Sequence, residues 1–144
     1  MGDVLVKRVR LALAVVAALG LGACVNPFEN TYENRIAVVD SVAVPETVVV
    51  RRRFAVTIYS QGPNLCWKKG PDSIGGTNVD VDITPYDQAY VGSGACAQAI
   101  AHFTHVVTLA LGARGTGTID IRHRLRSVAG GDSLATITRT VVVE

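Results

Sequence analysis

The 144-residue sequence predicts an all-β domain, an antiparallel β-sandwich of about seven strands over residues 36–144. Three observations favour this class. Residues with β-branched side chains dominate after residue 35, apolar and polar side chains alternate in several windows, and Gly-rich turns recur about every ten residues. A mean hydropathy of +0.31 with 49% hydrophobic residues excludes an intrinsically disordered chain.

The first expected strands lie between residues 36 and 59. Residues 36–44 form one, which Pro45 ends, and residues 48–50 form a short continuation. Further on, Phe54, Val56 and Ile58 alternate with smaller or more polar residues, which is the period of a half-buried strand. The Gln-Gly-Pro-Asn cluster at 61–64 predicts a turn.

The middle of the chain combines one clear strand with irregular segments. Residues 65–69 predict a short segment, and the Gly-rich residues 70–77 predict a loop. The alternation over residues 78–84 is the cleanest in the chain and predicts a strand that ends at Pro85. A long irregular connection over residues 86–103 is expected next, in which residues 97–103 can form a short helix.

Two inward-facing sets and a last strand follow. Val107, Leu109 and Leu111 form the first, and Ile119, Ile121 and Leu125 form the second after a turn at 113–117. Another Gly-rich turn at 129–132 leads to the last strand, 134–143, which carries threonines on one face.

The strand count resembles that of immunoglobulin-like domains. The sequence departs from the antibody pattern because Trp67 directly follows Cys66, and no tyrosine lies two residues before Cys96. A bond between these cysteines is therefore expected to join loops rather than cross the core between the sheets.

Residues 1–23 have the three parts of a secretory signal peptide. Lys7, Arg8 and Arg10 form a basic start, and residues 11–23 form an uncharged run of Leu, Ala, Val and Gly. The run is too short to cross a bilayer core, which needs roughly 20 apolar residues. The segment predicts export and a cleaved signal helix.

The end of this segment, Leu21-Gly22-Ala23-Cys24, resembles the lipobox of bacterial lipoproteins. The resemblance implies that the signal is cleaved before Cys24, that Cys24 carries diacylglycerol, and that the new N-terminus is usually acylated. Two or three acyl chains anchor a protein stably in a membrane. Residues 24–35, polar and without periodicity, are expected to form a lipidated tether to the domain at 36–144.

The resemblance also implies a place in the cell. The protein is expected in the bacterial cell envelope, held to a membrane by its lipid. In a cell with two membranes, Val25 after the cysteine resembles the outer-membrane class, on the periplasmic side or at the surface.

The charge balance excludes an electrostatic case for nucleic acid. The chain has 14 basic and 12 acidic residues, and cleavage removes three basic residues and Asp3. The remaining 11 of each sign cancel, so no basic surface for DNA or RNA is predicted.

Cysteine counting agrees with export. Of three cysteines, lipidation accounts for Cys24, and outside the cytoplasm Cys66 and Cys96 are expected to form a structural disulfide. Their bond would tie the long connection at 86–103 to residues 65–69, with the two Cα atoms within about 7 Å.

Candidate sites for chemistry are weak. His102, His105 and His123 are the only candidates for a zinc site, but residues three apart on a strand face opposite sides. Asp80, Asp82 and Asp87 lack the loop pattern of a calcium site. Basic side chains at 51–53 and at Arg122, Arg124 and Arg126 are candidates for an anionic ligand. No motif marks a nucleophile or a phosphate loop.

The sequence therefore predicts a lipid-anchored envelope protein without a cofactor, which acts as a non-enzymatic binding or structural module. Its expected partners are the membrane and either an envelope protein or a polysaccharide. The alternative is a small metal-dependent or hydrolytic envelope enzyme that uses the three histidines.

Overall fold

The structure, a computed structural model, describes residues 31–126 and 133–144. The expected signal helix at 1–23, Cys24 and most of the expected tether lie outside these residues. The described part is all-β, with nine strands in place of the seven expected: β1 (Tyr32–Ile36), β2 (Val38–Ala43), β3 (Thr47–Val48), β4 (Phe54–Gly62), β5 (Lys68–Gly76), β6 (Asp80–Tyr90), β7 (Ala101–Leu109), β8 (Gly115–Leu125) and β9 (Ser133–Val143).

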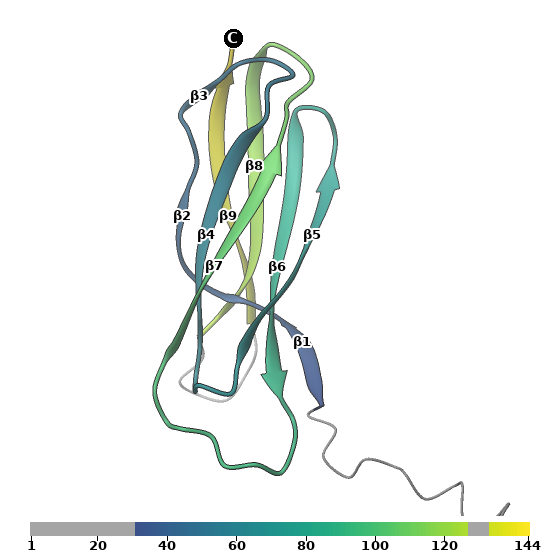
Figure 1. The fold of residues 1–144 in the computed structure, drawn as a ribbon. Coiled ribbons are helices and arrows are strands. Elements are labelled where there is room, and N and C mark those ends of the chain that lie inside the picture. The colour runs from purple at the N-terminus through teal and green to yellow at the C-terminus, as the bar shows by residue number, and fades with distance from the viewer. Residues whose placement is uncertain (1–30, 127–132) are drawn as a thin grey trace, which may run out of the picture.

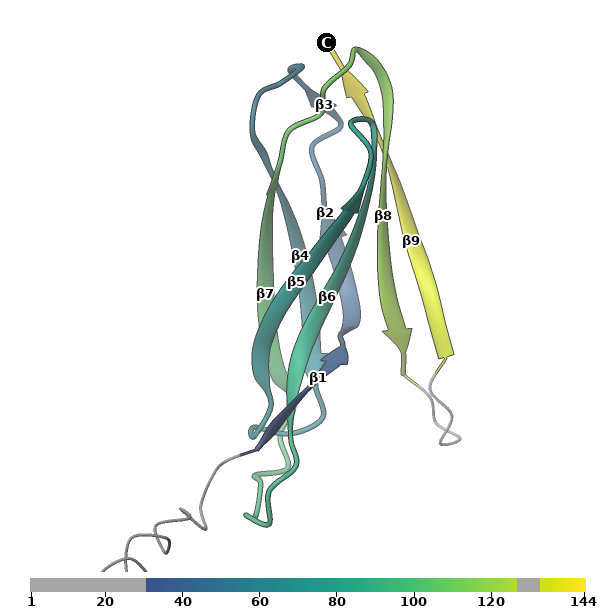
Figure 2. The ribbon, with the colours of Figure 1, turned by 90° about the vertical axis from the view of Figure 1, so that its right-hand side faces the viewer.

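The strands form two sheets that pack face to face (Figures 1 and 2). The larger sheet has the order β1-β6-β8-β9-β3, and β5 also pairs with β6. The smaller sheet has the order β2-β4-β7. Most neighbouring strands are antiparallel, whereas β6 with β8 and β3 with β9 are parallel. The predicted β-sandwich is confirmed.

The chain changes sheets at Ala37, within the single strand expected at 36–44. β1 pairs with β6 of the larger sheet, and β2 pairs with β4 of the smaller one. Between them, the Ala37 N–H donates to the Pro85 carbonyl at 2.9 Å, and the Ala37 carbonyl accepts from the Arg124 N–H at 2.9 Å. Because β1 begins at Tyr32, the domain also starts inside the segment expected to be a tether.

The interior between the sheets is aliphatic over much of its length. Val56 and Ile58 of β4 face inward with Val107 and Leu109 of β7. The larger sheet supplies pairs of inward-facing residues from three strands: Val81 and Ile83, Ile119 and Ile121, and Val141 and Val143. Burial of these alternating positions provides the main driving force for folding. Leu111 is fully buried as expected, but Leu125, also expected inside, is 45% exposed at the end of β8.

The prediction of a loop at 70–77 is wrong, because β5 covers most of these residues. Among the described strands, β5 is an edge strand that pairs with β6 alone, and Pro71 lies where its register shifts, between Lys69 and Asp72. Pro71 is tolerated there because an edge strand has no second neighbour that needs the N–H group that proline lacks.

The strand expected to end at Pro85 continues to Tyr90. The N–H and C=O of one strand residue point to the same edge, and the Pro85 carbonyl faces Ala37 at the crossing between sheets. An N–H at position 85 would also point toward Ala37. The Ala37 carbonyl, however, already accepts a hydrogen bond from the Arg124 N–H. No ladder hydrogen bond is lost, so β6 passes through the proline.

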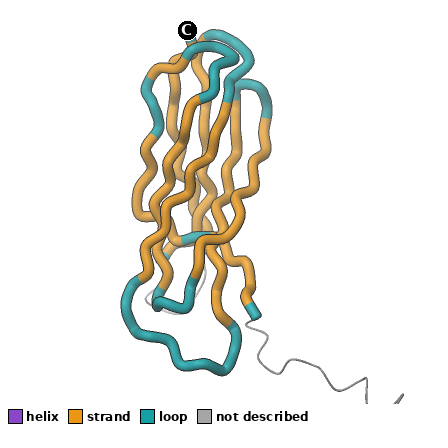
Figure 3. The backbone as a smooth tube through the Cα atoms, viewed as in Figure 1, coloured by secondary structure: helices purple, strands orange, loops and turns teal. Residues whose placement is uncertain are grey.

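The connection expected at 86–103 is shorter than predicted and spans residues 91–100. The prediction of a short helix at 97–103 is wrong. The described residues contain no helix, and Ala101 already belongs to β7. Figure 3 shows this connection as a long loop at one end of the strands.

The two ends of the sandwich differ in what they carry. One end, here named the attachment end, carries the start of β1, the β4–β5 loop at 63–67 and the loop at 91–100. The opposite end, named the far end, carries the C-terminus and the β3–β4 connection at 49–53 (Figure 1). There the Arg51 N–H donates to the Leu111 carbonyl at 2.7 Å.

Candidate functional site

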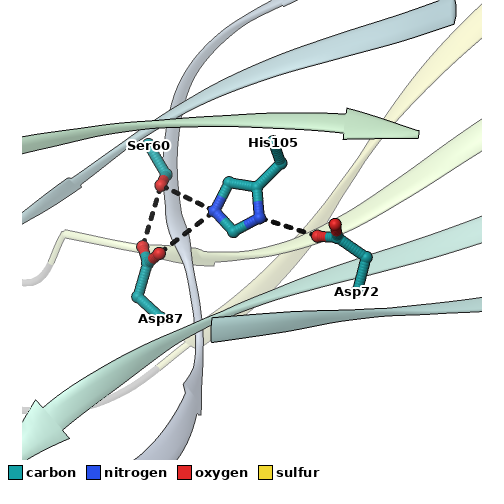
Figure 4. Close-up of polar contacts among 4 residues, drawn as sticks. All are labelled: Ser60, Asp72, Asp87 and His105. Carbon is teal, nitrogen blue, oxygen red and sulfur yellow. Dashed lines mark hydrogen bonds and ion pairs between the residues drawn. The ribbon is translucent and has the colours of Figure 1, made fainter. Parts of the chain in front are cut away.

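A group of polar side chains is buried between the sheets, toward the attachment end. Ser60 on β4 is 1% exposed, and Asp87 on β6 and His105 on β7 are completely buried. Asp72 on β5 joins them from the edge of the larger sheet (Figure 4). These four residues are named the polar cluster.

Strand alternation brings three members of the cluster together. Ser60 continues the inward face of Val56 and Ile58, and His105 lies on the inward face of Val107 and Leu109. Asp87 has the same parity as Val81 and Ile83 on β6. On each strand, inward-facing aliphatic residues toward the far end are therefore followed by one inward-facing polar residue toward the attachment end.

The contacts link both sheets. His105 Nε2 lies 3.0 Å from Asp87 Oδ1, and His105 Nδ1 lies 2.7 Å from Asp72 Oδ1. The Ser60 hydroxyl donates to Asp87 Oδ2 at 2.8 Å and lies 3.2 Å from His105 Nε2. β4 and β7 belong to the smaller sheet, whereas β5 and β6 belong to the larger one, so these bonds connect the two layers.

Both ring nitrogens of His105 face a carboxylate, which favours the doubly protonated ring. Burial lowers the pKa of His105, but the Asp87 hydrogen bond, the charges of Asp72 and Asp87 and the Asp72 hydrogen bond outweigh it, so the pKa lies above its ordinary value. The imidazolium then donates to both carboxylates, and the serine satisfies the second oxygen of Asp87. Such a fully bonded cluster stabilises one arrangement of the two sheets.

Some of these contacts are those of a hydrolase triad, in which a serine contacts a histidine that is oriented by an aspartate. Two features oppose that chemistry. The serine proton is donated to Asp87, and the same carboxylate occupies the histidine nitrogen that would act as the base. The hydroxyl and the ring are also buried, so no substrate carbonyl reaches them.

The three histidines proposed for a metal do not come together. His102 is exposed and His105 is buried on the same strand, as expected for residues three apart. His123 is inward on β8 and 7% exposed, and its Nδ1 has no hydrogen-bond partner in the structure. Within residues 31–126 and 133–144, no cluster of His, Cys, Asp or Glu is arranged to hold a metal ion.

The acidic residues considered for calcium are separated by the sheet. Asp80 and Asp82 are exposed on the outer face of β6, whereas Asp87 belongs to the same strand and points inward. The sequence placed Asp87 in the irregular connection after Pro85, and this prediction is wrong because β6 continues through Pro85 to Tyr90.

The basic residues do not form one continuous face. Arg122 is exposed on the outer face of the larger sheet, while the Arg124 guanidinium lies 5.6 Å from the centre of the Trp67 ring. The three arginines at 51–53 are exposed at the far end.

The expected disulfide is present in the structure. Cys66 and Cys96 are bonded, with their Cα atoms 5.5 Å apart. The bond joins the β4–β5 loop to the loop at 91–100, as predicted, and the Leu65 N–H donates to the Ala97 carbonyl beside it at 3.1 Å.

A second candidate site is a polar groove of about 410 Å³ on the outer face of the larger sheet. Carboxylates, hydroxyl groups and one guanidinium line it: Ser73, Gly75, Asp82, Thr84, Asp120, Arg122 and Thr136. Asp82 and Asp120 are register partners on parallel strands, and Asp120 accepts a hydrogen bond from Thr138 Oγ1 at 2.5 Å. The groove is open to solvent, in contrast to the polar cluster.

Sequence reasoning missed Ser60 and Asp72 and gave Asp87 the wrong place. One signal was available for Ser60, Asp87 and His105, since each occupies an inward position in an alternating strand where an apolar residue is expected. Asp72 gave no such signal, because it lies in the segment interpreted as a loop.

No family model, curated protein or solved structure matches this chain. Within the described residues, no helix is long and apolar enough to span a membrane.

Proposed function

We propose that this protein is a lipid-anchored, non-enzymatic binding module of the bacterial cell envelope, and that it binds envelope polysaccharide in its polar groove. The observation that carries the proposal is the lining of that groove, which offers hydrogen-bond donors and acceptors but no cysteine, and no histidine that would activate a serine.

The anchor rests on the sequence Leu21-Gly22-Ala23-Cys24 after a basic and then apolar segment. The Cys66–Cys96 disulfide supports export, because such bonds persist in oxidising compartments. Val25 favours the outer membrane in a cell that has two membranes.

The groove suits a polyhydroxylated ligand. Sugar hydroxyl groups donate to the carboxylates of Asp82 and Asp120 and accept from the Arg122 guanidinium. The threonine and serine hydroxyl groups of the lining both donate and accept hydrogen bonds. The lining has no aromatic or large apolar side chain, so it lacks the anchors that are enriched at protein interfaces.

The anchor is tested by Cys24→Ser. The variant is expected to move from the membrane fraction to the soluble fraction, and the N-terminal peptide of the wild-type protein is expected to carry the mass of its acyl chains. A variant that stays in salt-washed membranes would contradict the anchor.

The groove is tested by co-sedimentation with purified peptidoglycan and with soluble envelope polysaccharide as a competitor. Asp82→Ala with Asp120→Ala is expected to weaken binding about tenfold or more, because charged hydrogen bonds contribute about 1.5–3 kcal/mol each. Glu46→Ala, which removes an exposed carboxylate at the far end, is the matched control. Equal binding by both variants would exclude the groove, and no binding by the wild-type protein would exclude the polysaccharide.

The hydrolase alternative makes a different prediction, because the Ser60 hydroxyl would then have to be a nucleophile activated by His105. A fluorophosphonate probe is expected to leave Ser60 unmodified in the folded protein. Labelling that disappears in Ser60→Ala would favour the enzyme instead.

A further inference from the structure

The loop at 91–100 in the attachment end is unusually apolar for an exposed segment. Its sequence, VGSGACAQAI, has no charged residue, and every residue except the half-buried Cys96 is exposed. Val91 is 41% exposed, Ile100 is 44% exposed, and neighbouring Leu65 is 56% exposed. Single exposed apolar residues also occur elsewhere on the domain, but this loop combines two of them with a neighbouring third and has no charged side chain between them.

The loop is held in place by several bonds. The disulfide ties it to the β4–β5 loop, the Ala97 carbonyl accepts from the Leu65 N–H, and the Gly94 N–H donates to the Tyr90 hydroxyl at 3.1 Å. These bonds reduce the freedom of a segment that has few buried side chains. Its apolar groups are therefore presented in a fixed arrangement, which lowers the entropy lost on binding.

The position of the loop relative to Cys24 limits what it can contact. The Val91 N–H donates to the Thr31 carbonyl at 3.0 Å, so the loop adjoins the start of the described chain. Six residues lie between Cys24 and Thr31, and even fully extended the two Cα atoms are at most about 25 Å apart. A lipid on Cys24 keeps this loop, rather than the far end, close to the bilayer surface.

The side chains around the loop are those typical of a membrane interface. The Tyr32 and Tyr90 rings lie 5.6 Å apart, Lys68 Nζ lies 4.0 Å from the centre of the Tyr32 ring, and Trp67 is beside the disulfide. Tyrosine and tryptophan favour the headgroup region, and lysine reaches lipid phosphates. The far end instead exposes arginines at 51–53 together with Glu46 and Glu144.

We infer that the attachment end docks on the bilayer, with Leu65, Val91 and Ile100 in contact with lipid. This inference rests on the proposed anchor at Cys24, because the apolar area of a few side chains is too small for stable membrane binding alone. Docking orients the sandwich so that its strands and the groove extend away from the membrane.

The test uses the full protein, purified from membranes with its native N-terminus and reconstituted in vesicles of phosphatidylethanolamine and phosphatidylglycerol. Hydrogen exchange of the amides at 91–100 is compared with that of Cys24→Ser protein in solution. The expected result is exchange slower by about fivefold or more on the vesicles, with no change at the far-end loop 110–114.

Leu65→Asp with Ile100→Asp is expected to remove this protection without releasing the protein from the vesicles. The matched control is Val49→Asp with Ile74→Asp, which changes two similarly exposed side chains outside the attachment end and is expected to keep the protection. Loss of protection in both pairs would contradict a specific docking surface.

The docking and the anchor fail in different ways. The mass of the N-terminal peptide shows whether Cys24 is acylated, whatever the exchange result. Acylated protein whose loop exchanges as fast on vesicles as in solution would refute docking and leave the anchor standing. Protein without acyl chains that also fails to sediment with vesicles would refute both, and protection that requires added envelope proteins would assign the surface to a protein partner.

Discussion

The interior of this sandwich has two halves that are stabilised in different ways. Toward the far end, Ile58, Ile83 and Val107 pack as aliphatic side chains. Toward the attachment end, the same three strands place Ser60, Asp87 and His105 in a hydrogen-bonded cluster. The aliphatic half depends on volume and buried area, whereas the polar half depends on each donor meeting its acceptor. Only the polar half is expected to respond to pH.

The largest effect is expected from Asp87→Ala. The change leaves the His105 ring and the Ser60 hydroxyl buried without their main acceptor, and removing one partner of a buried ion pair costs about 3–5 kcal/mol. Urea unfolding at neutral pH measures the loss.

Asp82→Ala, on the outer face of the same strand, is the control and is expected to change stability by less than about 0.5 kcal/mol. A similar small change for Asp87→Ala would show that the cluster is not needed to hold the two sheets together.

The second effect concerns the disulfide next to the polar half. Cys66→Ala with Cys96→Ala is expected to lower the free energy of unfolding by about 2–4 kcal/mol, because the unfolded chain gains the freedom of a loop closed over 30 residues. The sandwich is expected to stay folded, since the alternating strands build the core independently. Far-ultraviolet circular dichroism checks the fold, and a variant without strand signal would contradict this independence.

The third prediction is a pH dependence that only the polar half provides. The pKa of His105 is raised on folding, so its stabilising contribution is complete below the unfolded pKa of about 6.5 and is lost as pH rises through the folded pKa. Losing the proton leaves one ring nitrogen facing Asp72 or Asp87 without a hydrogen between them.

Urea unfolding from about pH 6 to about pH 9 is expected to show stability falling with pH in the wild-type protein. His105→Leu removes that slope, whereas His102→Ala, on the exposed face of the same strand, keeps it. A slope that persists in His105→Leu would assign the titration to another group.

The smallest effect is expected from Ser60→Ala, which removes one hydrogen bond but leaves both carboxylates on His105. A loss of about 1 kcal/mol is expected, measured by urea unfolding at neutral pH. Thr57→Ala, on the opposite face of β4, serves as the control. A loss as large as that of Asp87→Ala would mean that the serine, rather than the ion pair, holds the cluster together.

The sequence by itself determined the class of fold and the position of most core residues. Alternation of Val56 with Ile58, and of Ile119 with Ile121, is a local property of the chain, because successive side chains of a strand face opposite sides. The pairing of Cys66 with Cys96 also followed from counting, since the expected lipid on Cys24 left no other partner.

Only the tertiary structure decided the rest. Pro85 lies inside β6, and Pro71 inside β5, because the neighbouring strands at those points need no N–H from them, and strand neighbours are not written in local sequence. The polar cluster also depends on which strands become neighbours. Asp72, Asp87 and His105 become partners only when β5, β6 and β7 meet across the two sheets, and a hydrogen bond depends on that three-dimensional arrangement rather than on the residue types alone.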